Sequence, residues 1–212
     1  QRIQNLDPIR YGETRNHLSG DVSYLSPYIS RGVISTKMVL HAMLAKGFQL
    51  EEIESLAKEL CWRDYFQRVA QVKDVQEDLK FPQRDVLHDE IPRNVVSAET
   101  GIQGIDQAIR DLYAHGYMHN HARMYTASVV CNVAKSRWKL PSKWMYYHLL
   151  DGDFASHACS WQWVAGSGAD ASPYFRIFNP ITQGQKFDAD GRYVRRWVPE
   201  LRGVPDRWLH AP

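Results

Sequence analysis

Residues 151–188 have the sequence DGDFASHACSWQWVAGSGADASPYFRIFNPITQGQKFD. The first part predicts a helix from Asp153 to about Val164, because the Asp153 side chain can accept hydrogen bonds from backbone N–H groups two or three residues further on. On that helix Asp153, His157 and Trp161 are spaced four residues apart and form a stripe of acid, imidazole and indole. After Gly166, glycine and proline are frequent, which predicts an irregular C-terminal wrap.

Two carboxylates, from Asp151 and Asp153, flank Gly152 at the start of this helix. They could serve only as a cap and as a complement to the helix dipole. They could equally accept hydrogen bonds from the N–H groups of a heteroaromatic ligand or from the hydroxyls of a sugar. The residues themselves leave both interpretations open.

The remainder of the chain also predicts helices, interrupted by glycine and proline. We expect them at 51–73, at about 118–136 and at about 142–150, and from Thr100 to a stop at Gly116. Residues 74–99 predict a loop with a short helix, and no alternating strand pattern of useful length occurs. The prediction is one all-α domain over residues 1–212. The 51–73 helix should bury an apolar stripe made of Ile53, Leu56, Ala57, Leu60, Cys61, Tyr65, Val69 and Val72.

The composition is that of an ordinary soluble globular protein, with 44% hydrophobic and 24% charged residues. No apolar run is long enough to span a membrane, so we expect no membrane span and no membrane partner. The 26 basic and 24 acidic residues give a net charge of +2, which excludes a global basic field for nucleic acids. Any contact with DNA must therefore come from local placement of arginine and lysine.

The three cysteines, Cys61, Cys131 and Cys159, lie among apolar or aromatic residues and have no CxxC spacing. This pattern argues against a disulfide framework and against a zinc site. We expect buried, inert thiols and no bound metal. A reducing, intracellular location in the cytoplasm, nucleoid or nucleus follows from the same pattern.

Two of the predicted helices carry a second face that a purely structural helix does not need. On the 51–73 helix, Glu59, Trp62, Arg63 and Phe66 line up at i, i+3, i+4 and i+7. A solvated Glu59–Arg63 pair would be ordinary, but the two aromatic rings are harder to leave in water.

The 118–136 helix carries the other such face. There His119/Arg123 and Asn120/Met124 are each one turn apart, so an amide, a cation and a thioether share one patch. That patch suits a planar polar ligand better than a core. His119 and His121 point to different sides of the helix, which disfavours a metal pair.

Motifs in the same order along the chain connect these faces with a known family. They are YGETRN at 11–16, SYLSPYISRGVIS at 23–35, TGIQGIDQAIRDL at 100–112, MHNHARM at 118–124, LLDGD at 149–153, WQW at 161–163, DASPYFRIFNP at 170–180, QGQKFD at 183–188 and GRYVRRWVPEL at 191–201. Together they resemble the FAD-binding helical domain of the photolyase/cryptochrome family. The usual N-terminal antenna domain is absent from this chain, so light harvesting is expected from the flavin alone or from a separate antenna subunit.

The resemblance implies a helical bundle that holds FAD at its centre. The implied cofactor-binding residues are Tyr11, Ser23, Leu25, Ser26, Glu59, Arg63, Asn120, Arg123, Asp151, Gly152, Asp153 and His157. Hydroxyls and an arginine suit the diphosphate, and carboxylates suit the edge of the flavin ring.

The resemblance also implies binding of DNA with a pyrimidine dimer turned out over the flavin. The implied DNA-binding residues are Arg15, Trp62, Asn120, His121, Met124, Trp163, Arg176 and Gln183. Trp62 and Trp163 would sandwich the bases, and Glu59 would hydrogen-bond the dimer. At His121 many relatives have an arginine that reaches DNA, so phosphate binding should be weaker here.

The resemblance also implies a catalytic set that takes part in electron transfer, made of Glu59, Trp138, Trp161 and His157. Trp161 and Trp138 match the first two members of the family's tryptophan relay. No tryptophan lies between Trp62 and Trp138 to supply the third, so a tyrosine or Trp144 is the expected substitute.

His157 is the largest departure from the family pattern, because it occupies the position beside flavin N5. An imidazole titrates near neutral pH, so its charge is expected to tune the reduced flavin; a neutral, packed histidine is the alternative. Three functions compete. They are a light-driven photolyase for cyclobutane pyrimidine dimers, a cryptochrome-like photoreceptor with a signalling partner, and a flavin store or light-independent redox module.

Overall fold

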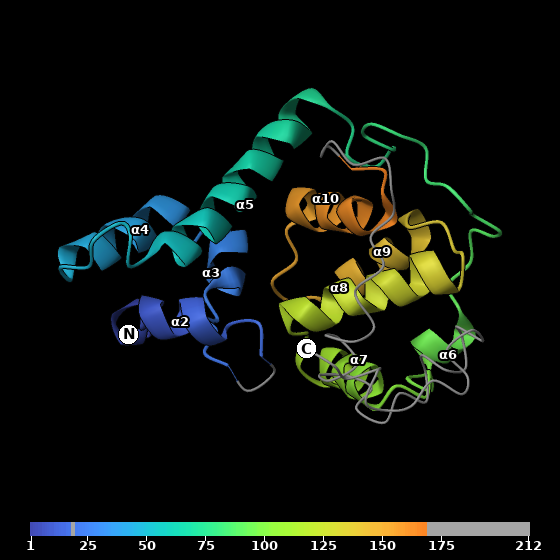
Figure 1. Ribbon diagram of the computed structural model, residues 1–212, viewed down its shortest axis with the longest axis horizontal. Coiled ribbons are helices and arrows are strands. Elements are labelled where there is room, and N and C mark those ends of the chain that lie inside the picture. The colour runs from blue at the N-terminus through green and yellow to red at the C-terminus, as the bar shows by residue number, and fades with distance from the viewer. Residues whose placement is uncertain (18–19, 169–212) are drawn as a thin grey trace, which may run out of the picture.

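Helices form the regular elements of the computed structural model, which describes residues 1–17 and 20–168 (Figure 1). They are α1 (Arg2–Asn5), α2 (Pro8–Thr14), α3 (Ser26–Ser30), α4 (Thr36–Ala45), α5 (Glu54–Val72), α6 (Arg93–Val96), α7 (Gln103–His115), α8 (Asn120–Ser128), the π-helical turn η1 (Val129–Val133), α9 (Lys139–His148) and α10 (Phe154–Ala165). Within the described ranges the β contact is one isolated bridge, between His88 and Ser136. The predicted all-α class is confirmed. No helix in this part of the chain is both long and apolar enough to cross a membrane.

Local sequence explains where the helices begin and end. The Asp7 carboxylate accepts from the backbone N–H groups of Ile9 and Arg10, both at 3.0 Å, and starts α2. Asp153 caps α10 as predicted, since it accepts from the Ser156 N–H at 2.8 Å. Gly116 follows α7 in the left-handed conformation (φ 65°), which glycine adopts without strain, so the predicted stop is confirmed.

Two hydrophobic clusters form the core, and α5 contributes to both. The smaller contains Leu25, Val39, Met43, Ile53 and Leu56. The larger is built from α7 to α10 with the end of α5, where Val69 is buried. Figure 1 shows α5 between α2–α4 on one side and α8–α10 on the other. The single domain over residues 1–212 stays a prediction.

The predicted apolar stripe on α5 is only partly buried. Leu56 and Val69 are buried, but Tyr65 and Val72 are 44% and 79% exposed. Cys61 is also exposed, so the prediction of three buried thiols is wrong for it and confirmed for Cys131 and Cys159. The physical reason is that α5 bridges two clusters, which leaves part of its length uncovered.

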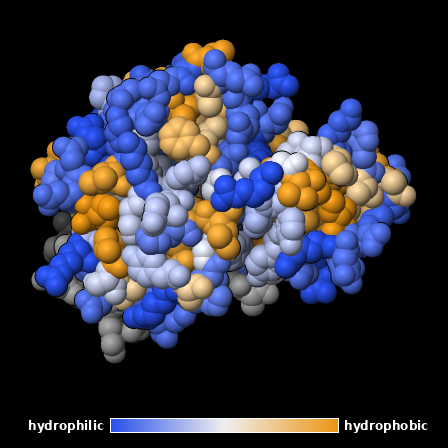
Figure 2. Space-filling model, turned by 180° about the vertical axis from the view of Figure 1, so that it is seen from behind, coloured by the Kyte–Doolittle hydropathy of each residue, from blue (hydrophilic) through white to orange (hydrophobic). Residues whose placement is uncertain are grey.

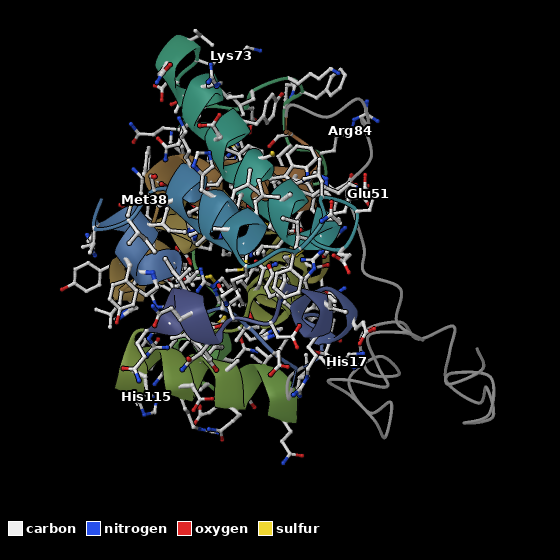
Figure 3. All side chains as sticks on the ribbon, turned by 90° about the vertical axis from the view of Figure 1, so that its left-hand side faces the viewer. His17, Met38, Glu51, Lys73, Arg84 and His115 are labelled. Atoms are coloured by element: carbon white, nitrogen blue, oxygen red, sulfur yellow. The ribbon has the colours of Figure 1, made fainter. Side chains whose placement is uncertain are left out.

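The surface around the smaller cluster also carries exposed apolar side chains. In the side view of Figure 3, α4 and α5 lie next to each other, with Met38 on the outside of α4 and Lys73 beyond the end of α5. Val33, Met38 and Leu44 are exposed in this region. Figure 2 shows apolar residues gathered on the part of the molecule formed by the N-terminal helices, within a largely hydrophilic back face.

Buried glutamines fasten the long 74–99 segment to the larger cluster. Gln162 of α10 is fully buried; it accepts from the Leu79 N–H and donates to the Val75 carbonyl, both at 2.9 Å. Gln83 donates to the Ser136 carbonyl at 3.0 Å and accepts from the Trp138 N–H at 2.8 Å. Side chains thus satisfy backbone groups that a loop would otherwise bury unpaired.

A buried carboxylate organises the approach to α7. Asp106, 7% exposed, accepts hydrogen bonds from the Thr100 N–H at 2.8 Å, from the Thr100 hydroxyl, and from the Gly101 N–H at 3.2 Å. The helix therefore begins at Gln103, three residues later than the predicted Thr100.

Replacing Asp106 with alanine should destabilise the fold. Buried donors on Thr100 and Gly101 would lose their acceptor, so we expect the free energy of unfolding to fall by about 2–4 kcal/mol. Urea denaturation measures this. The matched control is Asp64→Ala on α5, because Asp64 is 58% exposed and its pair with Arg68 should contribute less than about 0.5 kcal/mol. Equal losses in the two variants would contradict the role assigned to Asp106.

Candidate functional site

A cavity with two adjoining lobes lies where α5, α8 and α10 face the N-terminal helices. The inner lobe, about 140 Å³, is lined mainly by α8, α10 and the turn at 151–153. The outer lobe, about 270 Å³, extends to α2, to residues 22–24 and along α5. The residues that line both lobes are Ser26, Arg63, Asn120, Arg123, Asp151, Ser156 and Ser160.

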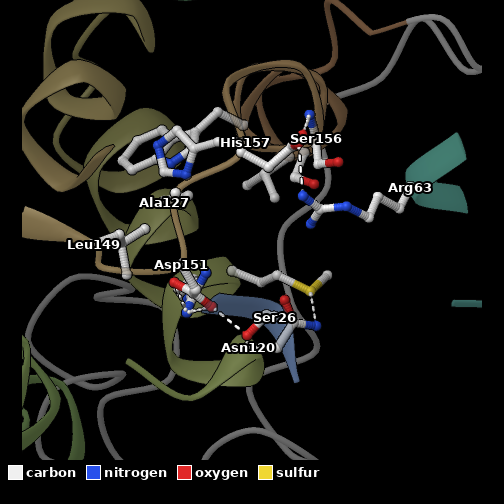
Figure 4. Close-up of a pocket in the computed structure, with 15 residues that line it drawn as sticks. Ser26, Arg63, Asn120, Ala127, Leu149, Asp151, Ser156 and His157 are labelled. Carbon is white, nitrogen blue, oxygen red and sulfur yellow. Dashed lines mark hydrogen bonds and ion pairs between the residues drawn. The ribbon is translucent and has the colours of Figure 1, made fainter. Parts of the chain in front are cut away.

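Asp151 is buried at the boundary between the lobes, and its charge is compensated. Arg123 Nη2 lies 2.9 Å from Oδ1 and 2.8 Å from Oδ2 of the carboxylate. The Ser26 hydroxyl donates to Oδ2 at 2.7 Å, so α3 and α8 meet at this carboxylate (Figure 4). Arg123 is itself held in place, because its Nε donates to the Met118 carbonyl at 2.7 Å.

Asp153 joins α10 to α5. Its Oδ1 accepts from the Ser156 N–H at 2.8 Å, and its Oδ2 accepts from Arg63 Nη2 at 2.8 Å and from the Gln67 amide. Both members of the Arg63–Asp153 pair are well shielded, with side chains 18% and 11% exposed. Figure 4 shows Arg63 reaching from α5 to the start of α10. Of the two interpretations that the sequence left open, helix capping is observed for Asp153. Both carboxylates also form an ion pair with an arginine.

The outer lobe combines a shielded ion pair with exposed aromatic rings. Arg15 Nη1 lies 2.9 Å from Glu59 Oε1. Burial, together with the Glu59 charge, raises the pKa of Tyr11 in the same lobe to about 12, so the phenol stays neutral. Trp62 is 53% exposed and stacks on Phe66, with ring centroids 5.6 Å apart.

His157 lines the inner lobe in a neutral state. Its Nε2 lies 2.8 Å from the Ser142 carbonyl, which can only accept, so Nε2 carries the proton. Desolvation by burial lowers the pKa of His157 to about 4, although the Ser142 carbonyl acts in the opposite direction. The expected titration near neutral pH is therefore wrong, because burial was not visible in the sequence. The alternative, a neutral histidine, agrees with this lowered pKa. The side chain is not only packed in the core, however, because it also lines the cavity.

The two tryptophans that the resemblance assigns to an electron relay are both buried. Trp161, 2% exposed, lines the inner lobe, and Trp138, 3% exposed, donates its indole N–H to Asp78 at 2.7 Å. Both belong to the larger hydrophobic cluster. Trp144, the suggested substitute for the third member, donates its indole N–H to the Tyr113 hydroxyl at 3.1 Å.

The cavity gathers most of the residues named from the sequence. Every expected cofactor-binding residue lines one of the two lobes except Leu25, which is buried in the smaller cluster. Of the expected DNA-binding residues, Arg15, Trp62, Asn120 and Met124 line the cavity. Trp163 and His121 line neither lobe; Trp163 packs half-buried against the larger cluster. Arg176 and Gln183 lie outside the described residues.

The polar residues that line the cavity and that sequence reasoning missed include Ser156, Ser160 and Tyr117. Ser156 and Ser160 border both lobes, and Tyr117 borders the outer one. Tyr117 lies under the Arg123 guanidinium, whose central carbon is 5.7 Å from the ring centroid. The spacing of Ser156 and Ser160 by four residues was a readable signal. Instead, the neighbouring stripe that contains His157 was assigned to the site.

The neutral state of His157 predicts a pH dependence of stability. Its pKa is about 4 in the folded state and 6.5 when unperturbed, so between these values the unfolded chain binds more protons. Stability should therefore fall as the pH drops through this window. Between pH 6.5 and pH 5 we expect the wild type to lose on the order of 1–2 kcal/mol more than His157→Gln. Urea denaturation at both pH values tests this, and equal losses would rule out the buried neutral imidazole.

Solved structures with this fold are photolyases and cryptochromes. A bacterial class III photolyase from Agrobacterium tumefaciens matches with a TM-score of 0.73 and 37% identity, covering 100% of this chain and 45% of that one. A Synechocystis cryptochrome matches with a TM-score of 0.74 and 28% identity, covering 100% of this chain and 47% of that one.

Sequence comparison gives the same family. The chain is 40% identical over 199 residues to the deoxyribodipyrimidine photo-lyase of Agrobacterium fabrum, which covers 90% of this chain and 41% of the relative. The Escherichia coli deoxyribodipyrimidine photo-lyase is 35% identical over 202 residues, covering 90% and 42%. The chain thus spans less than half the length of these relatives. Residues 55–212 match the family model described as the FAD binding domain of DNA photolyase, and the chain belongs to that family.

Proposed function

We propose that this chain binds FAD in the two-lobed cavity and uses light to split cyclobutane pyrimidine dimers in DNA. The observation that carries the proposal is the continuity of the cavity. The inner lobe contains arginine–carboxylate pairs, and the adjoining outer lobe carries the exposed Trp62–Phe66 stack. A cofactor and a flat base can therefore occupy neighbouring sites.

The inner lobe and its border suit FAD in their chemistry. Arg63 and Arg123, with the hydroxyl of Ser23, supply donors for a diphosphate. Because Asp151 and Asp153 are paired with arginines, they do not present a bare negative field to it. Trp161 and Tyr11 add aromatic wall for the rings.

When bound in its reduced form, FAD would supply an electron to the dimer on illumination and would take it back once the dimer has split into two pyrimidines. The residues of the chain position and shield the reactants. Arg15 holds the Glu59 carboxylate through Oε1, which leaves a second oxygen to accept a hydrogen bond from a base. Asn120 borders both lobes and Met124 borders the inner one, and an amide–sulfur contact of 3.8 Å joins the two side chains. The buried indole of Trp161 excludes water from the inner wall.

Trp62 is the residue we assign to base stacking. Its ring is exposed at the outer lobe and supported from behind by Phe66. A supported, rigid ring loses little freedom when a base stacks on it. Arg15, which lines the same lobe, provides a cation near the expected path of the backbone. The assignments of Trp163, Arg176 and Gln183 to DNA stay predictions from the resemblance.

A cryptochrome-like photoreceptor without repair activity is the second candidate. It is favoured by the match to the Synechocystis cryptochrome, whose TM-score of 0.74 is as high as that of the photolyase at 0.73. The same cavity would serve both functions. A photoreceptor is expected to change the redox state of bound FAD in light and leave dimers intact.

Light-dependent repair distinguishes the two candidates. The purified chain, loaded with FAD and reduced, is mixed with an oligonucleotide that contains one cyclobutane thymine dimer, and the dimer is quantified after illumination and in a dark control. We expect loss of the dimer only in light. An FAD-loaded chain that leaves the dimer intact in light would refute the photolyase proposal and favour the photoreceptor.

Replacing Trp62 with alanine should weaken binding of the dimer-containing oligonucleotide. Loss of one base–aromatic stack costs about 1–3 kcal/mol, which corresponds to a Kd roughly 5- to 150-fold higher. Fluorescence anisotropy measures the Kd, with FAD absorbance as a check on the inner lobe. Tyr147→Ala is the control, because Tyr147 is 84% exposed on α9 and lines neither lobe. Equal affinities of the two variants would contradict the role of Trp62.

A further inference from the structure

One hydroxyl in the cavity wall lacks a hydrogen-bond partner. The side-chain oxygens that are buried without a partner in the described residues belong to Thr126, Ser156 and Ser167. Of these three, Ser156 lines the cavity, and it lies on the border of both lobes. Helical serines commonly donate to a carbonyl three or four residues earlier. The Ser156 hydroxyl makes no such bond.

The two carboxylates and the imidazole nearby already have protein partners. The Asp153 carboxylate accepts from the Ser156 N–H, Arg63 and Gln67. Asp151 accepts from Arg123 and Ser26. His157, adjacent in sequence, donates its Nε2 proton to the Ser142 carbonyl and so has none left for a ligand.

Burial makes the Ser156 hydroxyl costly to leave unpaired. A buried donor without an acceptor keeps its full desolvation penalty, and α10 otherwise has well-satisfied polar groups at this end. Figure 4 shows Ser156 next to His157 at the start of α10, on the side that Arg63 approaches. A ligand with a polar acceptor in the inner lobe would satisfy the hydroxyl without moving any other group.

We infer that Ser156 is a cofactor-binding residue whose hydroxyl donates a hydrogen bond to bound FAD. The inference rests on the proposed binding of FAD and deepens it. It assigns the donor on the α10 wall to Ser156 and not to His157, the neighbour that the sequence pattern singled out.

The test compares Ser156→Ala with Ser167→Ala. Both remove a buried hydroxyl without a partner, but Ser167 follows the end of α10 and lines neither lobe. The Kd for FAD is measured by titration of the FAD-free chain, followed by flavin fluorescence. We expect a Kd about three- to tenfold higher for Ser156→Ala, the effect of one lost hydrogen bond, and an unchanged Kd for Ser167→Ala.

Thermal unfolding of the FAD-free variants separates binding from folding. Removal of an unpaired buried hydroxyl should leave both variants at least as stable as the wild type. A Ser156→Ala chain that is as stable as the wild type and binds FAD equally well would overturn the inference and leave FAD binding intact. A less stable Ser156→Ala chain would also overturn it, because the hydroxyl would then have a structural partner. A wild type that does not bind FAD would overturn the proposed function and this inference together.

Discussion

The turn Asp151-Gly152-Asp153 holds the two halves of the molecule on either side of the cavity. Its two carboxylates are buried or nearly so, and each requires a cation from a different helix. Arg123 of α8 serves Asp151, and Arg63 of α5 serves Asp153. Removing one partner of a shielded ion pair leaves an uncompensated charge, which is far more costly than the pair is favourable. The positions of α5, α8 and α10 are therefore coupled through three residues of backbone.

The same pairs explain why the cavity wall between the two hydrophobic clusters is polar. The helix α5 packs directly against α10. Arg63 of α5 meets Asp153 at the start of α10, with the two charged groups 2.8 Å apart. Ser26 completes the arrangement, since its bond to Asp151 ties α3 of the smaller cluster to the same turn. The polar side chains that line the cavity thus also link the helices that surround it.

The sequence predicted the helices and the gathering of site residues well, for local reasons. Helix periodicity, the Asp153 cap and the Gly116 stop depend on residues within one or two turns. Burial could not be predicted in the same way. The α5 stripe looked continuous, but Cys61 and Val72 are exposed because no other helix in the described part of the chain covers them. Whether a side chain is covered depends on packing between distant segments, which one helix's pattern does not contain.

His157 and Ser156 show the same limit within the site. The sequence identified an imidazole at a special position, and its ordinary pKa suggested a switch. Desolvation by burial lowers its pKa and keeps it neutral, while the Ser142 carbonyl, fifteen residues away, fixes the proton on Nε2. No pattern in the sequence singled out Ser156 as a site residue. It becomes notable only when the two carboxylates and the imidazole around it are found to be paired, which depends on residues from several helices.

In the proposed function, two adjacent residues of α5 would serve the two lobes of the cavity. Trp62 presents its ring to the outer lobe, and Arg63, the next residue of α5, reaches Asp153 at the inner lobe. Successive residues of a helix are held about 1.5 Å apart along its axis. A base stacked on Trp62 and a cofactor held near Arg63 would therefore keep a fixed separation. Sites on rigid elements hold reacting groups more precisely than sites on loops, and electron transfer between two bound molecules needs that fixed distance more than it needs any single catalytic group.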